Sequence, residues 1–330
     1  MKTSLRPFLS GIIDYAGLYP PSELPLEEAF RKYLSHTEQK EAWMLSKFVV
    51  GSGLLSDLIT LIDSEKESPS PFKITLVGSA SDDLDSFKKL IDNTVVAINN
   101  AHSSTSKSIK ISALEIKIPL TCLQKGSSPD LQAAIEYAVQ SMAKSETLPY
   151  QIFFEVPGFE FNIAHAQNLI QGIQTHNEWL ESNEKENYCF SGFKIRCGGV
   201  EAFQFPPTHY LAEAITFSRK NDVPLKFTAG LHHPIRHYND SVSTKMHGFL
   251  NVFGASILSY AKQLTEAELL EILNDEHASN FSFDESEFSW KGQSVSFEEL
   301  HMLRNLSVTS FGSCSFDEPV EDLQKLKLLK

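Results

Sequence analysis

Cysteine is scarce in this chain, and its spacing excludes the common metal-binding motifs. Four cysteines occur in 330 residues: Cys122, Cys189, Cys197 and Cys314. No two of them form a CxxC pair, and scattered single cysteines are typical of reduced thiols inside the cell. The first fifteen residues contain basic side chains but no apolar run long enough for a signal peptide. We therefore expect a cytoplasmic protein.

Long apolar runs and positive charge are also in short supply. No stretch approaches the roughly 18 apolar residues of a membrane helix, so the sequence predicts no membrane partner. The formal net charge of −13 argues against nucleic acid, because phosphate binding needs a basic face. Hydrophobic residues make up 42% of the chain, which is typical of a globular protein with an ample core. Whether the chain forms a homo-oligomer stays open.

Eight short segments rich in Ile, Val and Phe recur in the first 255 residues. Most run into Gly or Pro, as strands do. The expected strands are residues 8–13, 45–50, 72–77, 113–120, 151–156, 192–197, 225–229 and 248–253. The helical patterns between them are residues 25–34, 54–62, 82–101, 129–143, 164–179 and 208–221. Strands that alternate with helices pair in parallel, so the sequence predicts an α/β fold, a (β/α)8 TIM barrel over residues 1–263. An open doubly wound sheet is the competing fold.

The last 67 residues show a different pattern. Residues 264–330 predict a C-terminal α+β extension of helices and a hairpin packed on the barrel, because the segment has few apolar residues of its own. Thr265 and Glu268 form a capping box that starts a helix, and residues 287–296 resemble a hairpin. Small polar residues lie between aromatics at 311–317, where we expect a plain turn that could cover a pocket.

Two of the expected strands carry cations where a core should be apolar. They read FKIRCGG (residues 193–199) and LKFTAGLHHP (residues 225–234). Charged and apolar residues alternate with a period of two, so Lys194 and Arg196 share one face of the sixth strand, and Lys226 lies on the seventh. Burial of an unpaired ammonium group is very unfavourable. The pattern therefore predicts a functional site at these strands.

The neighbouring strands add charge of both signs. Glu115 and Lys117 lie two residues apart on the fourth strand, and Glu155 ends the fifth. Six inward residues would thus comprise four cations and two anions. A self-contained salt-bridge network is the structural alternative, but buried ion pairs stabilise poorly compared with apolar packing. The excess of two positive charges predicts a small anionic metabolite, a carboxylate or a phosphate, as the ligand.

Lys194 is the candidate nucleophile. A lysine beside other cations in a dry pocket has a lowered pKa, and its neutral amine can form a Schiff base with a carbonyl. We expect Lys226 to lower that pKa and to move protons, and Arg196 to bind the anion through its planar fork. Glu155 or Glu115 would serve as general base, and Asp14 would hydrogen-bond substrate hydroxyls.

The remaining candidates for substrate binding follow the strand ends. Glycines let backbone N–H groups approach an anion, and polar side chains near strand ends line the mouth of a barrel. These candidates are Lys117, Thr228, His232, His233, Asn251, Gly198, Gly199 and Gly254.

A metal site is the main chemical alternative. A metal-dependent hydrolase or isomerase would use His232, Glu155 and Asp14. His232 and His233 point to different sides of an extended chain, so at most one of them could bind a given ion. We therefore assign no metal ligand and no cofactor. A non-catalytic anion-binding barrel is the third hypothesis.

The lysine pair resembles that of class I aldolases of the deoxyribose-phosphate aldolase type. The resemblance covers about forty residues, implies a Schiff-base lysine at Lys194 and a second lysine at Lys226, and includes Ala229-Gly230. That type carries an aspartate on strand four, where this chain has Glu115 and Lys117. The segments KIRCGG, TAGLHHP and HGFLNVF also resemble a group of bacterial proteins without an assigned activity. This second resemblance implies a barrel but no reaction.

Overall fold

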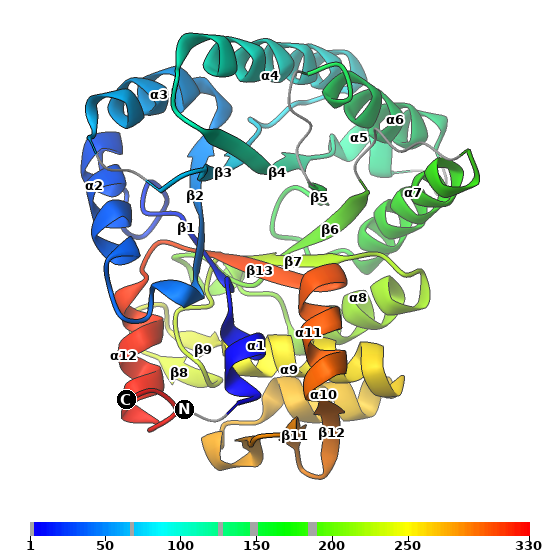
Figure 1. Cartoon of the computed structure of the whole chain (residues 1–330). Coiled ribbons are helices and arrows are strands. Elements are labelled where there is room, and N and C mark those ends of the chain that lie inside the picture. Colours follow the sequence, from blue (N-terminus) through cyan, green and yellow to red (C-terminus); the bar gives the residue numbers. More distant parts are fainter. Residues whose placement is uncertain (1–2, 67–68, 125–127, 146–150, 184–189) are drawn as a thin grey trace.

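Eight parallel strands close into a barrel at the centre of the molecule (Figure 1). This computed structural model describes residues 3–66, 69–124, 128–145, 151–183 and 190–330. Around the barrel the strands follow in the order β1-β13-β7-β6-β5-β4-β3-β2. Their bounds are β1 (Ile13–Tyr15), β2 (Leu45–Gly51), β3 (Phe72–Val77), β4 (Ile109–Lys117), β5 (Gln151–Glu155), β6 (Ser191–Arg196), β7 (Leu225–Thr228) and β13 (Val308–Ser313). The closed parallel sheet confirms the expected TIM barrel and excludes the open doubly wound sheet.

Helices between the strands cover the outside of the barrel (Figure 1). They include α2 (Leu26–Thr37), α3 (Leu55–Ser64), α4 (Leu84–Ser104), α6 (Pro129–Met142), α7 (Ile163–Ser182), α8 (Thr208–Lys220) and α11 (Phe297–Leu306). Their buried positions recur every three to four residues, as Leu55, Leu58, Ile59 and Ile62 do in α3, which gives each helix one apolar face. Because helices cover the outer side of the strands, the strands are rich in buried Ile, Val and Phe.

The expected eighth strand at residues 248–253 is wrong. These residues lie at the start of α9 (Phe249–Lys262), whose first eleven residues are all buried. A helix that is buried on every side has a continuous apolar sequence. Over six residues, such a run cannot be distinguished from a buried strand by its periodicity.

The eighth strand comes from the segment that we expected to form the extension. β13 lies between β1 and β7 and pairs Phe311 with Ile13 on one side and with Phe227 on the other. The boundary after residue 263 therefore does not separate a barrel from an appendage. Only Val308 and Phe311 of the six residues in β13 are large and apolar, so the sequence pattern there was too weak to predict a strand.

A buried arginine forms hydrogen bonds with both the N-terminal segment and β13. Phe8, expected in the first strand, lies in α1 (Leu5–Leu9), and β1 begins only at Ile13. Arg304 on α11 donates hydrogen bonds to the carbonyls of Phe8 at 2.8 Å and Ser10 at 3.1 Å, and also to those of Val308 and Thr309. One guanidinium group thus satisfies carbonyl groups at both ends of the chain.

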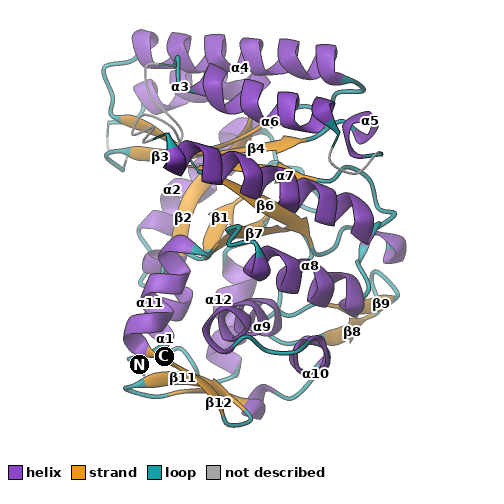
Figure 2. Cartoon of the chain, turned by 90° about the vertical axis from the view of Figure 1, so that its right-hand side faces the viewer, coloured by secondary structure: helices purple, strands orange, loops and turns teal. Residues whose placement is uncertain are grey.

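The remaining elements pack below the barrel, where Figure 2 shows α9 and α10 above a small sheet. This sheet contains β10 (Phe281–Phe283), β11 (Glu287–Trp290) and β12 (Gln293–Ser296), which confirms the expected hairpin. The capping box of Thr265 and Glu268 does start a helix, α10 (Glu266–Asn274). A second hairpin follows β7 and consists of β8 (His237–Asn239) and β9 (Thr244–Met246).

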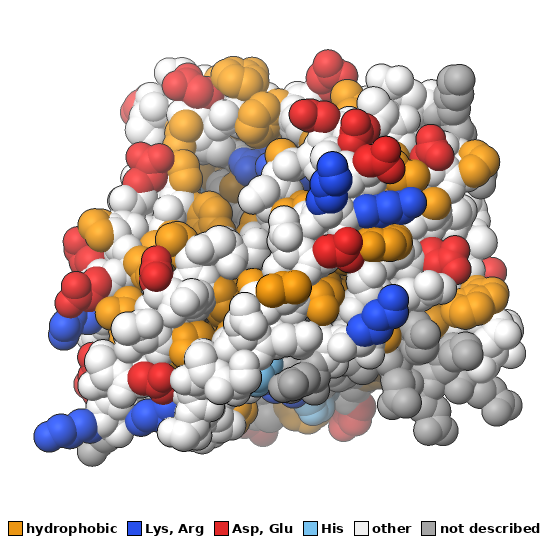
Figure 3. All heavy atoms as spheres, turned by 90° about the horizontal axis from the view of Figure 1, so that it is seen from above, with side chains coloured by type: hydrophobic (Ala, Val, Ile, Leu, Met, Phe, Trp, Pro, Cys, Tyr) orange, Lys and Arg blue, Asp and Glu red, His pale blue; other side chains and the backbone are white. Residues whose placement is uncertain are grey.

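The surface agrees with the acidic composition of the chain. Figure 3 shows Asp and Glu side chains spread over one face and interspersed with apolar, lysine and arginine side chains. Among the described residues, no helix is both long and apolar enough to cross a membrane.

Candidate active site

Charged side chains on four adjacent strands lie at matching positions near the carboxyl ends of those strands. The sheet register pairs Lys117 with Glu155, Glu155 with Lys194, and Lys194 with Lys226. Two more charged residues lie two positions away on the same sides of β4 and β6: Glu115 and Arg196. The carboxyl ends of parallel strands meet at one end of a barrel, where TIM-barrel enzymes have their active sites. The structure thus brings the six predicted charged residues together.

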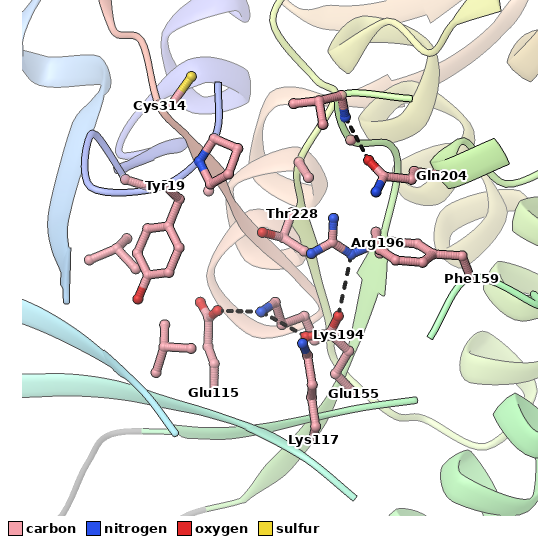
Figure 4. Close-up of a pocket in the computed structure, with 18 of the residues that line it drawn as sticks. Tyr19, Glu115, Lys117, Glu155, Phe159, Lys194, Arg196, Gln204, Thr228 and Cys314 are labelled. Carbon is pink, nitrogen blue, oxygen red and sulfur yellow. Dashed lines mark hydrogen bonds and ion pairs between the residues drawn. The ribbon is translucent and has the colours of Figure 1, made fainter. Parts of the chain in front are cut away.

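Lys194 lies between two carboxylates, as Figure 4 shows. Its Nζ is 2.6 Å from Oε2 of Glu115 and 2.9 Å from Oε2 of Glu155, and the side chain is only 7% exposed. Burial opposes the charge, but the two carboxylates outweigh burial, so the pKa of Lys194 is raised. The expectation that neighbouring cations lower this pKa is therefore wrong. The carboxylates are closer to the amine than Arg196 or Lys226 and determine its charge.

Lys226 lies deeper and is fully buried, in contact with Asp14. Its Nζ also donates to Oγ of Ser310 at 2.7 Å and is 3.5 Å from Oε1 of Glu115. Glu115 therefore lies between the two lysines and bridges them. Lys226 can exchange protons with Glu115, whose other carboxylate oxygen contacts the amine of Lys194.

Asp14 belongs to the barrel interior and does not line the cavity. Its carboxylate accepts from Nζ of Lys47 at 3.1 Å and from hydroxyls of Thr75 and Ser310, in addition to Lys226. Burial would raise the pKa of Asp14, but Lys226 and Lys47 hold it well below its usual range. A side chain with these partners and no exposure cannot bind substrate hydroxyls, so that prediction is wrong.

A cavity of about 300 Å³ opens above Lys194. Lys194, Glu115 and Glu155 form part of its wall, and Lys117, Thr228 and Gly199 also line it. Arg196 packs its guanidinium over the ring of Phe159 at 5.2 Å and donates to the carbonyl of Gly198 at 3.0 Å. Tyr19 lies on the opposite side of the cavity from Phe159 in Figure 4. Burial raises the pKa of its hydroxyl to about 12.

The charges of this interior do not balance. Its positively charged side chains outnumber its carboxylates by two. The cations are Lys47, Lys117, Lys194, Arg196 and Lys226, and the carboxylates are Asp14, Glu115 and Glu155. Lys117 makes no ion pair within 4 Å among the residues that the structure describes. Cations in a partly dry cavity favour an anionic ligand.

Four residues that we expected to bind substrate have structural roles instead. His233 pairs through Nδ1 with Asp322 at 2.5 Å and does not line the cavity. Asn251 on α9 is fully buried and donates to the carbonyls of Ile272 and Asp275 at 2.7 Å. The two glycines are needed for packing. A Cβ at Gly254 would lie 3.0 Å from the ring of Phe288, and a Cβ at Gly198 would lie 2.8 Å from Cα of Gly230.

Several residues of the site were missed because their sequence signals were weak. Lys47 is the third residue of β2, a segment that we expected to be a strand, but Ser46 precedes it, so its pattern is weaker than that of Lys226. Ser310 and Cys314 come from the segment whose barrel strand was not recognised. Tyr19 follows β1 in a loop that has no strand or helix period.

The metal hypothesis finds no support in the geometry. Its three residues have separate partners, since Asp14 pairs with lysines, Glu155 with Lys194, and His232 with Glu318. Across the described part of the chain, no group of three His, Cys, Asp or Glu side chains is close enough to hold a metal ion.

Comparisons with known proteins do not assign a family. No family model matches the chain, and no curated protein is significantly similar to it. The resemblance to class I aldolases therefore stays a prediction from a short stretch of sequence.

Proposed function

We propose that the protein is a class I aldolase-like lyase, which forms an imine between Lys194 and a small anionic carbonyl compound. The observation that carries the proposal is the position of Lys194 in the cavity wall, with Glu115 at 2.6 Å and Glu155 at 2.9 Å from its amine. A buried amine with carboxylates at hydrogen-bond distance has both the nucleophile and the proton acceptor that imine formation needs.

The raised pKa of Lys194 sets the order of the proton transfers. The free protein holds Lys194 as an ammonium, so Glu155 or Glu115 takes one proton as the substrate carbonyl arrives. Nζ then forms a bond to the carbonyl carbon as the π electrons move to the oxygen, and a second proton passes from Nζ to that oxygen, which gives a neutral carbinolamine. The carboxylic acid returns its proton to the carbinolamine oxygen, and water leaves to form the iminium. Lys226 contacts Glu115 at 3.5 Å and can resupply protons to it.

The iminium then accepts electrons from the substrate. In the cleavage direction, a hydroxyl group on the β-carbon loses its proton to a base, the Cα–Cβ bond breaks, and its electron pair moves into an enamine. Glu155 is suited to be that base, because Lys194, Lys117 and Arg196 lower its pKa against the effect of burial and keep it ionised. Protonation and hydrolysis of the enamine release the second product and the free amine.

Arg196 and Lys117 are suited to bind the anionic group of the substrate. Both line the cavity beside Lys194, and both belong to the excess of positive charge. A planar guanidinium that is already held over Phe159 loses little rotational freedom when it binds a carboxylate or a phosphate. A non-catalytic anion-binding barrel would use the same two residues, so the imine is what distinguishes the two hypotheses.

Borohydride trapping tests the imine. The protein is incubated with pyruvate, glyoxylate, glycolaldehyde phosphate or dihydroxyacetone phosphate in turn, then reduced and digested for mass spectrometry. We expect a stable adduct on Lys194 with at least one of these compounds. The Lys194→Arg variant should lose the adduct, and Lys73→Met, which changes an exposed lysine of β3, should keep it.

The result can contradict the proposal in two ways. An adduct spread over surface lysines with none at Lys194 would reject imine chemistry at this site. Protection of the fold by these anions without any adduct at Lys194, lost in Arg196→Gln, would instead support an anion-binding barrel. Thermal melting with and without each compound measures that protection.

A further inference from the structure

A cysteine and a histidine line the same cavity, and a glutamate contacts the histidine. Sγ of Cys314 lies 3.9 Å from Nε2 of His232, and Nδ1 of His232 lies 2.9 Å from Oε2 of Glu318. Cys314 and His232 both line the cavity, with Cys314 7% exposed. A nucleophile, a base within reach and a third group that orients the base form the general arrangement of an activated thiol. Contacts of this kind are often long before a substrate binds.

The barrel closure produces this arrangement. β13 and β7 are paired neighbours, with Gly312 beside Thr228. Cys314 directly follows β13, His232 follows β7, and Glu318 lies in the first turn of α12 (Asp317–Lys325). Figure 4 shows Cys314 on the opposite side of the cavity from Phe159. The thiol and Lys194 therefore contribute to one cavity from different strands.

The surroundings of Cys314 favour the thiolate. Burial disfavours it, but the hydrogen bond and charge of His232 outweigh burial and lower the pKa of Cys314. Burial likewise opposes the imidazolium, yet Cys314 and Glu318 raise the pKa of His232 to about 9. The other titratable groups that face this cluster are Tyr15 from β1, and Asp322 and His233 beside Glu318.

The other described cysteines differ from Cys314 in this respect. Cys197 is fully buried, and burial raises its pKa despite the opposing charge of Arg196. Burial also raises the pKa of Cys122. Buried thiols whose pKa is raised are inert. The chain therefore contains its own internal controls for a reactive thiol.

We propose that Cys314, His232 and Glu318 form a second nucleophilic centre, which captures the aldehyde group of a small anionic compound in the cavity. Thiolate addition forms a bond between Sγ and the carbonyl carbon, and the π electrons move to the oxygen. That oxygen takes the proton from Nε2 of His232, which yields a neutral thiohemiacetal and a neutral imidazole. Glu318 is a positioning residue that holds Nε2 toward the thiol. The reaction needs no leaving group or further reactant and does not depend on an imine at Lys194.

Alkylation rates measure the nucleophile. Iodoacetamide forms a bond from Sγ to its methylene carbon, iodide leaves, and peptide mapping assigns the rate to each cysteine. At pH 6.5 we expect Cys314 to react about ten times faster than Cys122 or Cys197. His232→Gln should lower the Cys314 rate by about tenfold and move its pH profile toward the ordinary thiol pKa of about 8.5. Glu318→Gln should cause a smaller loss of the same kind.

Iodoacetate tests the preference for an anion. The cationic wall of the cavity should raise the rate of iodoacetate relative to that of iodoacetamide at Cys314. Arg196→Gln should reduce the rate with iodoacetate more than the rate with iodoacetamide. If the Cys314 rate follows an ordinary thiol titration and His232→Gln has no effect, the proposed centre is wrong.

Glyoxylate separates this centre from the proposed imine. Bound as a thiohemiacetal, glyoxylate should slow the alkylation of Cys314 reversibly, and this protection should persist in Lys194→Arg. Protection that disappears in Lys194→Arg would show that the imine alone shields the thiol, and would overturn the aldehyde capture. Conversely, failure of borohydride trapping at Lys194 leaves these alkylation results unchanged.

Discussion

At the scale of single residues, Asp14 connects the cations of the interior. It contacts Lys226 and accepts from Lys47 at 3.1 Å, while Ser310 donates to it at 3.1 Å. All of these contacts are made by groups largely hidden from water, where an unpaired charge is very unfavourable. Asp14 therefore determines whether two lysines can be buried in this barrel.

Loss of this single carboxylate should destabilise the fold. We expect Asp14→Asn to lower the free energy of unfolding by about 3–5 kcal/mol, because Glu115 at 3.5 Å is then the one carboxylate left beside buried Lys226 among the described residues. Urea denaturation measures the loss. The double variant Asp14→Asn with Lys226→Met should recover part of it, since the unpaired charge is gone. Equal stability of the single and double variants would contradict this account.

The dependence of protein stability on pH should also show the contribution of Asp14. The pKa of Asp14 is lowered in the folded protein, so its contribution is present above the unfolded value of about 4 and is lost as the pH falls toward the folded value. The free energy of unfolding of the natural protein should therefore fall more steeply between pH 5 and pH 3 than that of Asp14→Asn. Parallel curves would show that other carboxylates carry the acid sensitivity.

The inward placement of Lys194 could be predicted at the residue scale, but its charge state could not. The alternation of FKIR gives the side of the strand from sequence alone. Its pKa depends on which carboxylate oxygens lie within 3 Å of Nζ, and these come from β4 and β5. Sequence contains the charges but not the distances between them.

At the scale of elements, the carboxyl ends of β6 and β7 approach each other closely through glycine. Cα of Gly198 and Gly230 face one another, and Gly230 has a φ of +69°, in the left-handed region that favours glycine. The expected role of Gly198 in anion binding rested on its missing side chain. The structure uses the same property for backbone packing, beside the strand that carries Arg196.

A methyl group at this contact should be costly. We expect Gly198→Ala to lower the free energy of unfolding by about 1–3 kcal/mol, because its Cβ would lie 2.5 Å from the ring of Phe205 and 2.8 Å from Gly230. The matched control is Gly53→Ala, where nothing lies within 4 Å of the new Cβ. Denaturant titration of both variants measures the difference. A loss that is the same in both would contradict the packing argument.

At the scale of the whole molecule, the barrel needs both ends of the chain. β13, from the last 23 residues, pairs with β1 near the start and with β7. Without β13, the facing edges of β1 and β7 would expose unpaired backbone groups and apolar side chains. The C-terminal segment is therefore part of the barrel core, and it also supplies Ser310 and Cys314.

Truncation tests this dependence. A fragment of residues 1–263 should show no cooperative unfolding transition in urea and should bind a hydrophobic dye, because its barrel cannot close. Addition of a fragment of residues 264–330 should restore part of the transition, as the missing strand is returned. A cooperative transition of fragment 1–263 alone would show that the C-terminal segment is dispensable after all.

The sequence alone determined the fold class, six of the eight strand regions and the inward side of Lys194, Arg196, Lys226 and their carboxylates. These features follow from the local periodicity of apolar and charged residues, which can be read directly from the sequence. The tertiary structure decided the eighth strand, the partners of each lysine and the meeting of Cys314 with His232. These depend on contacts between residues distant in sequence, such as Asp14 and Lys226. Such contacts arise only when the barrel closes, so no local pattern encodes their distances.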